Sequence, residues 1–150
     1  MQILELINYG SQSLKNKDIF SHKLDSEILL AKILKKTREQ LLVHSNDQVN
    51  LVTIQVFKEL VKRRSLSEPI AYIVKEKEFW SKNFIVNKNA LIPRPETELM
   101  IEKIIKIFKN KDVYILDVGT GTGCILLSIL GELKNSRGIG IDISNKALKV

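Results

Sequence analysis

The sequence predicts an α/β protein, in which a small N-terminal helical bundle and a β-hairpin precede the beginning of a doubly wound parallel sheet. Three observations predict this class. Apolar residues recur at helical intervals up to about residue 66, short β-branched segments follow, and a glycine-rich turn then separates a strand at 112–119 from a helix. A second strand is expected at 137–144. Because two strands cannot bury both faces of such a sheet, we expect the sheet to be incomplete at residue 150.

Two helices are expected first in the chain. Residues 3–14 carry apolar side chains at helical intervals, and residues 27–36 repeat this pattern. The second helix is expected to have Asp25 or Ser26 as its N-cap, because both residue types accept hydrogen bonds from free backbone N–H groups.

Two further helices complete the predicted bundle. Thr37 is expected to cap a short third helix that ends near residue 44. The fourth helix is expected over residues 50–64, with the following side chains turned toward the core: Val52, Val56, Phe57 and Leu60. The bundle is too small to bury much core by itself.

The periodicity changes beyond the bundle. Residues 77–87 place aromatic and β-branched residues around a polar Ser-Lys-Asn turn, which predicts a hairpin that pairs Glu78–Trp80 with Phe84–Val86. Residues 96–110 return to a helical pattern. The predicted parts are a helical domain over 1–75, a hairpin linker over 76–90 and the beginning of the sheet domain over 91–150.

The composition excludes several functional classes. No apolar run approaches the ~18 to 20 residues of a membrane span, and the N-terminus does not resemble a signal peptide. The single cysteine, Cys124, excludes an internal disulfide and indicates a reducing compartment, so we expect a cytoplasmic protein without membrane association. No group of cysteine, histidine and acidic residues has metal-ligand spacing, and no metal site is expected.

The chain is basic, with a net charge of +7. Such a charge could attract nucleic acid or a ribosome-associated partner. The lysines are spread along the whole sequence, however, and the basic clusters at 35–38 and 62–64 fall where helices are expected to end and where cations favour the helix dipole. We therefore do not expect direct nucleic-acid binding.

The strongest local motif is Leu-Asp-Val-Gly-Thr-Gly-Thr-Gly-Cys at residues 116–124. A strand is expected to end at Asp117, and the three glycines allow a tight turn that approaches a ligand closely. The next helix would point free N–H groups at that ligand, and Asp142, after the following strand, could accept both hydroxyls of an adenosine ribose. The expected cofactor contacts are Asp117, Gly119, Thr120, Gly121, Thr122, Gly123 and Asp142.

Two cofactor classes compete for this loop, and a turn without a ligand is a third alternative. A dinucleotide usually requires Gly-x-Gly-x-x-Gly, but Cys124 occupies the place of the third glycine. S-adenosylmethionine (SAM) has no pyrophosphate and carries an ammonium and a sulfonium group, which suit the acidic Asp117 beside the loop. The loop is similar to motif I of SAM methyltransferases, and we expect SAM as the cofactor.

Three more segments extend the resemblance to essentially the whole chain. They are Glu-Pro-Ile-Ala-Tyr-Ile (68–73), Glu-Phe-Trp-Ser-Lys-Asn-Phe-Ile-Val-Asn (78–87) and Leu-Ile-Pro-Arg-Pro-Glu-Thr-Glu (91–98). Together with the glycine loop, they resemble the protein-(glutamine-N5) methyltransferases that modify peptide chain release factors in translation termination. The resemblance implies a helical domain that recognises the release factor, a hairpin linker and a Rossmann-like SAM-binding domain. The implied reaction is methylation of the glutamine amide nitrogen in a Gly-Gly-Gln loop.

The resemblance also implies that one segment lines the edge of the cofactor and substrate site: Pro93, Arg94, Pro95 and Glu96. The two prolines fix φ, so we expect this segment to be extended up to the region of Thr97. We assign Arg94 a role in ordering the site. Carboxylates here, Glu98 above all, could instead stabilise the dipole of the following helix.

The sequence departs from the family in several places. Ser67, Lys75 and the hairpin turn stand where the family often has glycine. The catalytic Asn-Pro-Pro-Tyr signature is absent from residues 1–150, so no catalytic residue is expected in this chain, and the chain as given is expected to lack the catalytic half and to be inactive. Two alternatives remain: an adenine-N6 methyltransferase acting on DNA or RNA, and a non-catalytic remnant that binds release factors.

Overall fold

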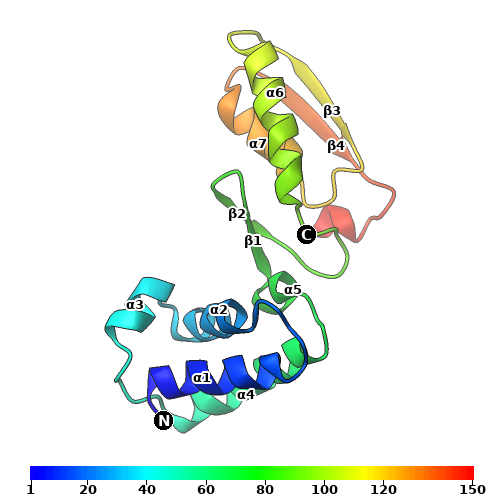
Figure 1. Cartoon of the computed structure of the whole chain (residues 1–150). Helices are drawn as coiled ribbons and strands as arrows, with labels where there is room; N and C mark the ends of the chain where they lie inside the picture. Colours follow the sequence, from blue (N-terminus) through cyan, green and yellow to red (C-terminus); the bar gives the residue numbers. More distant parts are fainter. The chain divides into compact units, whose positions relative to one another are not determined.

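The computed structural model describes residues 1–150. They form two compact units, Met1–Val74 and Lys75–Val150. The first unit is helical, and the second contains all of the strands (Figure 1). None of the helices combines the length and the hydrophobicity that crossing a lipid bilayer requires. The predicted class, a helical region followed by the beginning of a Rossmann-like domain, is confirmed.

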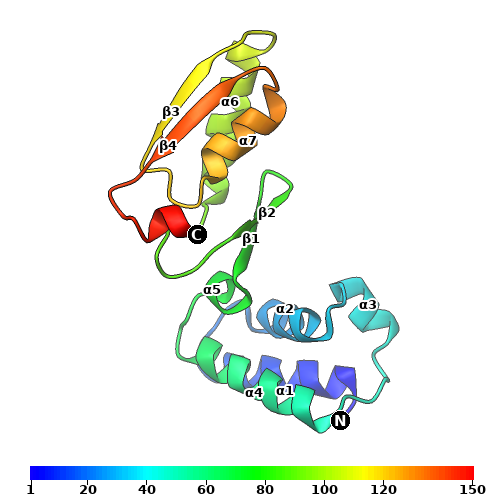
Figure 2. The ribbon, with the colours of Figure 1, turned by 180° about the vertical axis from the view of Figure 1, so that it is seen from behind.

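Five helices make up the first unit: α1 (Ile3–Lys15), α2 (His22–Leu34), α3 (Arg38–Val43), α4 (Leu51–Ser65) and α5 (Ile70–Val74). Helix α1 lies beside α2 and α4 in both views (Figures 1 and 2). Gly10 makes this close approach possible, because a Cβ there would lie 2.5 Å from Ser26 Oγ and 2.7 Å from the Phe57 ring. Ser26 Oγ donates a hydrogen bond to the Ile7 carbonyl of α1, which satisfies the buried hydroxyl.

One of the two predicted N-caps, that of α3, is confirmed. Thr37 caps α3 and Asn50 caps α4 through hydrogen bonds to the backbone of the first turn. Helix α2 begins at His22, earlier than expected, so the N-cap prediction for Asp25 and Ser26 is wrong. Both side chains are buried within the helix, because tertiary partners satisfy their polar atoms.

The buried face of α4 differs from the predicted one. Val52 and Val56 are exposed, whereas Ile54, Phe57 and Val61 are buried. Phe57 was predicted correctly, and its ring packs against Gly10 of α1. Leu60, which was also predicted to face inward, is partly buried against the same core. Because the largest side chain fills the space left by that glycine, it fixes which side of the helix faces inward.

Two arginines at the end of α4 pair with carboxylates in different surroundings. Arg64 Nε lies 2.6 Å from Asp25 Oδ2 of α2, which also accepts a hydrogen bond from the Ser21 hydroxyl. The Asp25 side chain is 4% exposed and that of Arg64 is 17% exposed. Arg63 pairs with Glu68, and both of these side chains remain in contact with water.

The second unit begins with a hairpin of β1 (Glu76–Phe79) and β2 (Lys82–Ile85). It continues through the 3₁₀ turn η1 (Pro95–Thr97), α6 (Glu98–Phe108), β3 (Tyr114–Val118), α7 (Cys124–Glu132), β4 (Arg137–Ile141) and η2 (Ala147–Lys149). Strands β3 and β4 are parallel, with Tyr114 opposite Arg137 and Val118 opposite Ile141. Helices α6 and α7 lie on one side of this pair (Figures 1 and 2). The other side exposes Tyr114, Leu116, Val118, Ile139 and Ile141.

The hairpin turn is shorter than predicted. Glu76 pairs with Ile85 and Phe79 with Lys82, so the loop consists of Trp80 and Ser81 and the predicted register is wrong. Both loop residues have positive φ, 52° and 54°, as in the two-residue turns that match the twist of the strands. The turn leaves the rings of Phe79 and Phe84 on one face, edge to face with centroids 6.1 Å apart.

Left-handed backbone occurs at the places where the family often has glycine. Ser67 has φ 65° and Lys75 has φ 63°, and both residues of the hairpin loop also have positive φ. A left-handed backbone conformation costs about 1–2 kcal/mol in a residue that has a Cβ. The substitution Ser67→Gly is therefore expected to raise the free energy of unfolding by about 0.5–1 kcal/mol, after the greater chain entropy of glycine is subtracted.

Urea denaturation of matched variants checks this expectation. Ser65, two residues earlier, is the last residue of α4 and has ordinary helical backbone, so Ser65→Gly should lower stability by about 0.5 kcal/mol. A decrease in stability for both variants would show that the left-handed backbone at Ser67 is not strained.

Candidate cofactor-binding loop

The glycine-rich loop joins β3 to α7 at the carboxyl ends of the two parallel strands. Asp117 is the last residue but one of β3, and Asp142 directly follows β4. Because the strands are parallel and in register, both carboxylates lie at the same edge of the sheet as the loop. The structure therefore brings together the residues that the sequence analysis assigned to the cofactor.

Backbone and side-chain hydrogen bonds hold this loop against β4. The N–H groups of Gly119 and Thr120 both donate to the Ile141 carbonyl, at 2.8 and 3.0 Å. The Thr120 hydroxyl donates to Asp117 Oδ2 at 2.8 Å, and Gly121 N–H donates to Asp142 Oδ2 at 3.0 Å. The loop is thus fixed by its own contacts without a ligand.

The three glycines of the loop all have positive φ: 81° at Gly119, 57° at Gly121 and 73° at Gly123. A Cβ added at Gly119 would meet nothing within 4 Å, so the space beside this residue is open to a ligand. Gly123 is the N-cap of α7 in left-handed conformation, and it starts a helix whose first N–H groups are free for an anion or a polar ligand.

Gly140 of β4 is part of this site, although the sequence analysis did not single it out. A Cβ at this position would lie 2.7 Å from Thr120 Oγ1 and 2.9 Å from both Thr120 Cβ and Cγ2. Only a glycine lets Thr120 pack onto β4 and donate its hydrogen bond to Asp117. The position of Gly140 inside a predicted strand was the available signal, because a glycine there often marks a close approach of another segment.

The environment shifts the pKa of two groups near the loop. The backbone N–H groups of Ser144 and then Gly121 lower the pKa of the Asp142 carboxyl below its ordinary 3.8. These hydrogen bonds are therefore present at neutral pH, and their contribution to stability is lost only as the pH falls through the lowered pKa. Burial raises the pKa of the Cys124 thiol, which is a packing residue and no thiolate nucleophile at neutral pH.

The loop residues fit SAM on three observations. Two carboxylates, Asp117 and Asp142, suit the positive charges and the ribose hydroxyls of this cofactor. The space beside Gly119 is open. The loop also leads into the first turn of α7, whose N–H groups have no intrahelical partners and can donate to a ligand. No group of His, Cys, Asp and Glu side chains could hold a metal ion.

The Pro93–Glu96 segment is extended over a shorter stretch than expected. Arg94 has φ −95° and ψ 134°, but the chain turns into η1 at Pro95. Proline has a fixed φ near −65° and needs no N–H partner, so it starts a helical turn readily. Pro93 is buried, whereas Arg94, Pro95 and Glu96 are exposed. No hydrogen bond or ion pair joins their side chains to the glycine loop.

Glu98 contacts the hairpin turn in addition to standing in the first turn of α6. Its Oε1 atom accepts a hydrogen bond from the backbone N–H of Trp80 at 2.9 Å, and the indole N–H of Trp80 donates to Glu132 Oε1 of α7 at 3.0 Å. The two carboxylates therefore fasten the hairpin turn to α6 and α7. The hairpin and these helices also share one apolar cluster around Phe79 and Ile101.

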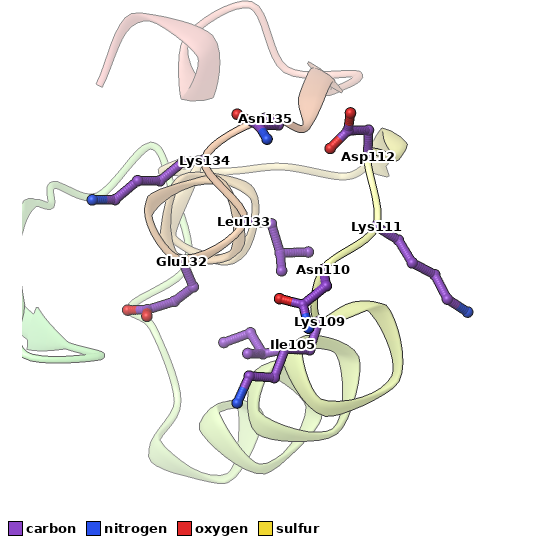
Figure 3. Close-up of a pocket in the computed structure, with 9 residues that line it drawn as sticks. All are labelled: Ile105, Lys109, Asn110, Lys111, Asp112, Glu132, Leu133, Lys134 and Asn135. Atoms are coloured by element: carbon purple, nitrogen blue, oxygen red, sulfur yellow. The ribbon is translucent and has the colours of Figure 1, made fainter.

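A hollow of about 710 Å³ lies at the other end of β3 and β4. It is formed mainly by the connections that lead into the amino ends of the strands, and its apolar lining residues are Ile105 and Leu133. Lys111 and Lys134 point away from it (Figure 3). It is not the cofactor site, because ligands of such sheets bind at the carboxyl ends of the strands.

Comparison with known proteins agrees with this architecture. Residues 5–74 match the PrmC N-terminal domain. The chain is 41% identical over its whole length to a release factor glutamine methyltransferase of Buchnera aphidicola (subsp. Acyrthosiphon pisum), covering 53% of that protein. The chain is similar throughout to the N-terminal portion of release factor glutamine methyltransferases. This confirms the resemblance inferred from the motifs.

Two further relatives are similar over nearly the whole of this chain. A release factor glutamine methyltransferase of Leptospira interrogans is 40% identical over 99% of the chain, which covers 52% of that protein. A bifunctional methyltransferase of Rickettsia felis is 37% identical over 99% of the chain, which covers 33% of it. The chain therefore spans about half the length of the release factor methyltransferases that it matches.

Proposed function

We propose that this chain supplies the helical recognition part and the cofactor loop of a SAM-dependent methyltransferase. The enzyme methylates the side-chain amide nitrogen of the glutamine in the Gly-Gly-Gln loop of peptide chain release factors. The observation that carries this proposal is the glycine loop fixed between two carboxylates, in a chain similar throughout to release factor glutamine methyltransferases. A location in the cytoplasm, and a partner that acts on the ribosome, are part of the same proposal.

The parts of the chain take separate tasks in this proposal. Residues 1–75 recognise the release factor, residues 76–90 link the two parts, and residues 91–150 begin the SAM-binding domain. The Pro93–Glu96 segment borders the substrate site. The hydrogen bonds of Trp80 to Glu98 and Glu132 support a linker that is fixed to the cofactor-binding part.

The geometry of the loop supports two of the proposed cofactor contacts, those of Asp142 and Asp117. SAM supplies a methyl group activated by the sulfonium charge when it is bound. Asp142 would accept the ribose hydroxyls with the lone pairs that its two backbone donors leave free. Asp117 already accepts the Thr120 hydroxyl at Oδ2, and its second oxygen is free to attract a cationic ligand.

The transfer itself needs groups that we do not place in residues 1–150. A glutamine amide nitrogen is a poor nucleophile, because its lone pair is delocalised into the carbonyl. Acceptors on both N–H groups are needed to orient it toward the methyl group and to stabilise the developing positive charge. Neither Asp117 nor Asp142 is assigned this role, because both are engaged with the loop and the cofactor.

Calorimetric titration with SAM tests the cofactor part. The substitution Asp142→Asn is expected to weaken SAM binding about tenfold or more, because it removes charge-assisted hydrogen bonds to the ligand and to Gly121. The matched control is Asp112→Asn at the other end of β3, which should leave the affinity within about twofold. Tighter binding of a nicotinamide dinucleotide than of SAM would reject the proposed cofactor.

A chimera tests the substrate. This chain would replace the matching N-terminal half of the Buchnera aphidicola relative, and methyl transfer from labelled SAM would be followed. We expect transfer to a release factor that carries Gly-Gly-Gln and none when the glutamine is replaced. Transfer to adenine in DNA or RNA instead would favour the nucleic-acid methyltransferase.

A further inference from the structure

A groove of about 460 Å³ in the helical unit lies between α1 and α4. The two helices lie side by side in both views (Figures 1 and 2). Helix α1 and its C-cap contribute Tyr9, Ser13 and Asn16, and α4 contributes Lys58, Lys62 and Ser65. The three residues of each helix are spaced by four and then by three positions, so they lie on one face of that helix.

The positive charge of this groove is not neutralised by the protein. Lys17, Lys58 and Lys62 line it, are exposed, and take part in no ion pair. Glu59 is the single carboxylate of the lining. The arginines of the same unit differ, because each of them is paired with a carboxylate of the chain. The groove therefore keeps free cations beside uncharged polar groups, which favours an anionic partner.

The details of the groove favour carboxylates over a nucleic acid. The ammonium group of Lys58 lies 5.2 Å from the centre of the Tyr9 ring, so this lysine covers the aromatic side chain on which a base would have to stack. No arginine lines the groove to bind phosphate oxygens in pairs. Lysine ammonium groups one helical turn apart match carboxylates at the same spacing on another helix.

We propose that the α1–α4 groove binds an acidic helical segment of a protein partner, with two carboxylates placed on Lys58 and Lys62. Lys17 and the hydroxyl groups of Ser13 and Ser65 would complete a polar rim around that segment. The proposal is independent of SAM, because the groove lies wholly within the helical unit.

Fluorescence anisotropy of the 150-residue chain with a labelled peptide tests the groove. The probe is a short helical peptide with two glutamates one turn apart, and its counterpart has glutamines in their place. At about 150 mM salt, where long-range attraction is largely screened, we expect the glutamate peptide to bind and the glutamine peptide to bind at least about tenfold more weakly. The double variant Lys58→Gln/Lys62→Gln should lose about tenfold or more in affinity for the glutamate peptide.

A second double variant, Lys23→Gln/Lys35→Gln, removes the same charge from exposed positions of α2 and its C-cap, and should change the affinity by less than about twofold. Equal losses in the two double variants would overturn the proposal, because they would show attraction to the net charge alone. Tighter binding of a single-stranded oligonucleotide at the same lysines would overturn it as well. Circular dichroism confirms that the variants fold, and SAM titration in parallel separates this result from that of the proposed methyltransferase.

Discussion

Replacing Arg64 with methionine is expected to lower the free energy of unfolding of the helical unit by about 3 kcal/mol. The guanidinium is the charged partner of Asp25, whose side chain is 4% exposed. It also donates to the Glu68 carbonyl, at 3.1 Å, and so holds the turn after α4. Without it, a buried carboxylate keeps only the Ser21 hydroxyl as a side-chain donor. Such a carboxylate is costly, because water no longer solvates it.

The neighbouring residue provides the control for this measurement. Arg63→Met removes the same charge from the same helix turn, but the Arg63–Glu68 pair is exposed to solvent and should cost about 0.5 kcal/mol or less. The double variant Asp25→Leu/Arg64→Met should recover much of the loss of Arg64→Met, because it leaves no buried charge unpaired. Urea denaturation followed by circular dichroism measures all three. Equal effects of the two single variants would show that burial of Asp25 is not the cause.

Gly140→Ala is expected to destabilise the second unit by about 2 kcal/mol and to displace the cofactor loop. The added methyl group would overlap three atoms of Thr120, including its Cβ, which cannot move away unless the backbone of the loop moves with it. Thr120 would have to leave Asp117, and the hydrogen bonds from the loop to Ile141 would lengthen with it. Denaturation measures the stability, and amide chemical shifts of Gly119 and Gly121 report the displacement.

Two variants show whether Thr120 is the obstacle. Thr120→Gly removes all three close atoms, so in a double-mutant cycle it should offset much of the cost of Gly140→Ala. Gly131→Ala in α7 would approach only the flexible end of Lys82, and it should raise stability by up to about 1 kcal/mol through helix propensity. Strict additivity of the Thr120 and Gly140 effects would contradict the proposed contact.

The sequence by itself determined the order of the main elements, with the exception of the short α5, and the positions of the candidate cofactor residues among them. Thr37 and Asn50 cap their helices as local chemistry requires, and the glycine loop lies between a strand and a helix. The parallel pairing of β3 and β4 also follows from the sequence pattern, because a helix connects them. It places Asp117 and Asp142 at one edge without further information.

Only the tertiary structure decided features that depend on partners distant in the chain. Asp25 is a residue type that often serves as an N-cap. In the structure its carboxylate instead pairs with Arg64 of another helix inside the core, and α2 starts earlier in the chain. Glu98 could have served the helix dipole alone, but the hairpin turn brings the Trp80 N–H within its reach. Gly140 lies inside a strand, where a glycine can mark a close approach, but only the packing shows that Thr120 occupies the space beside it. Local propensity and periodicity act over a few residues, whereas these contacts exist only after the chain has packed.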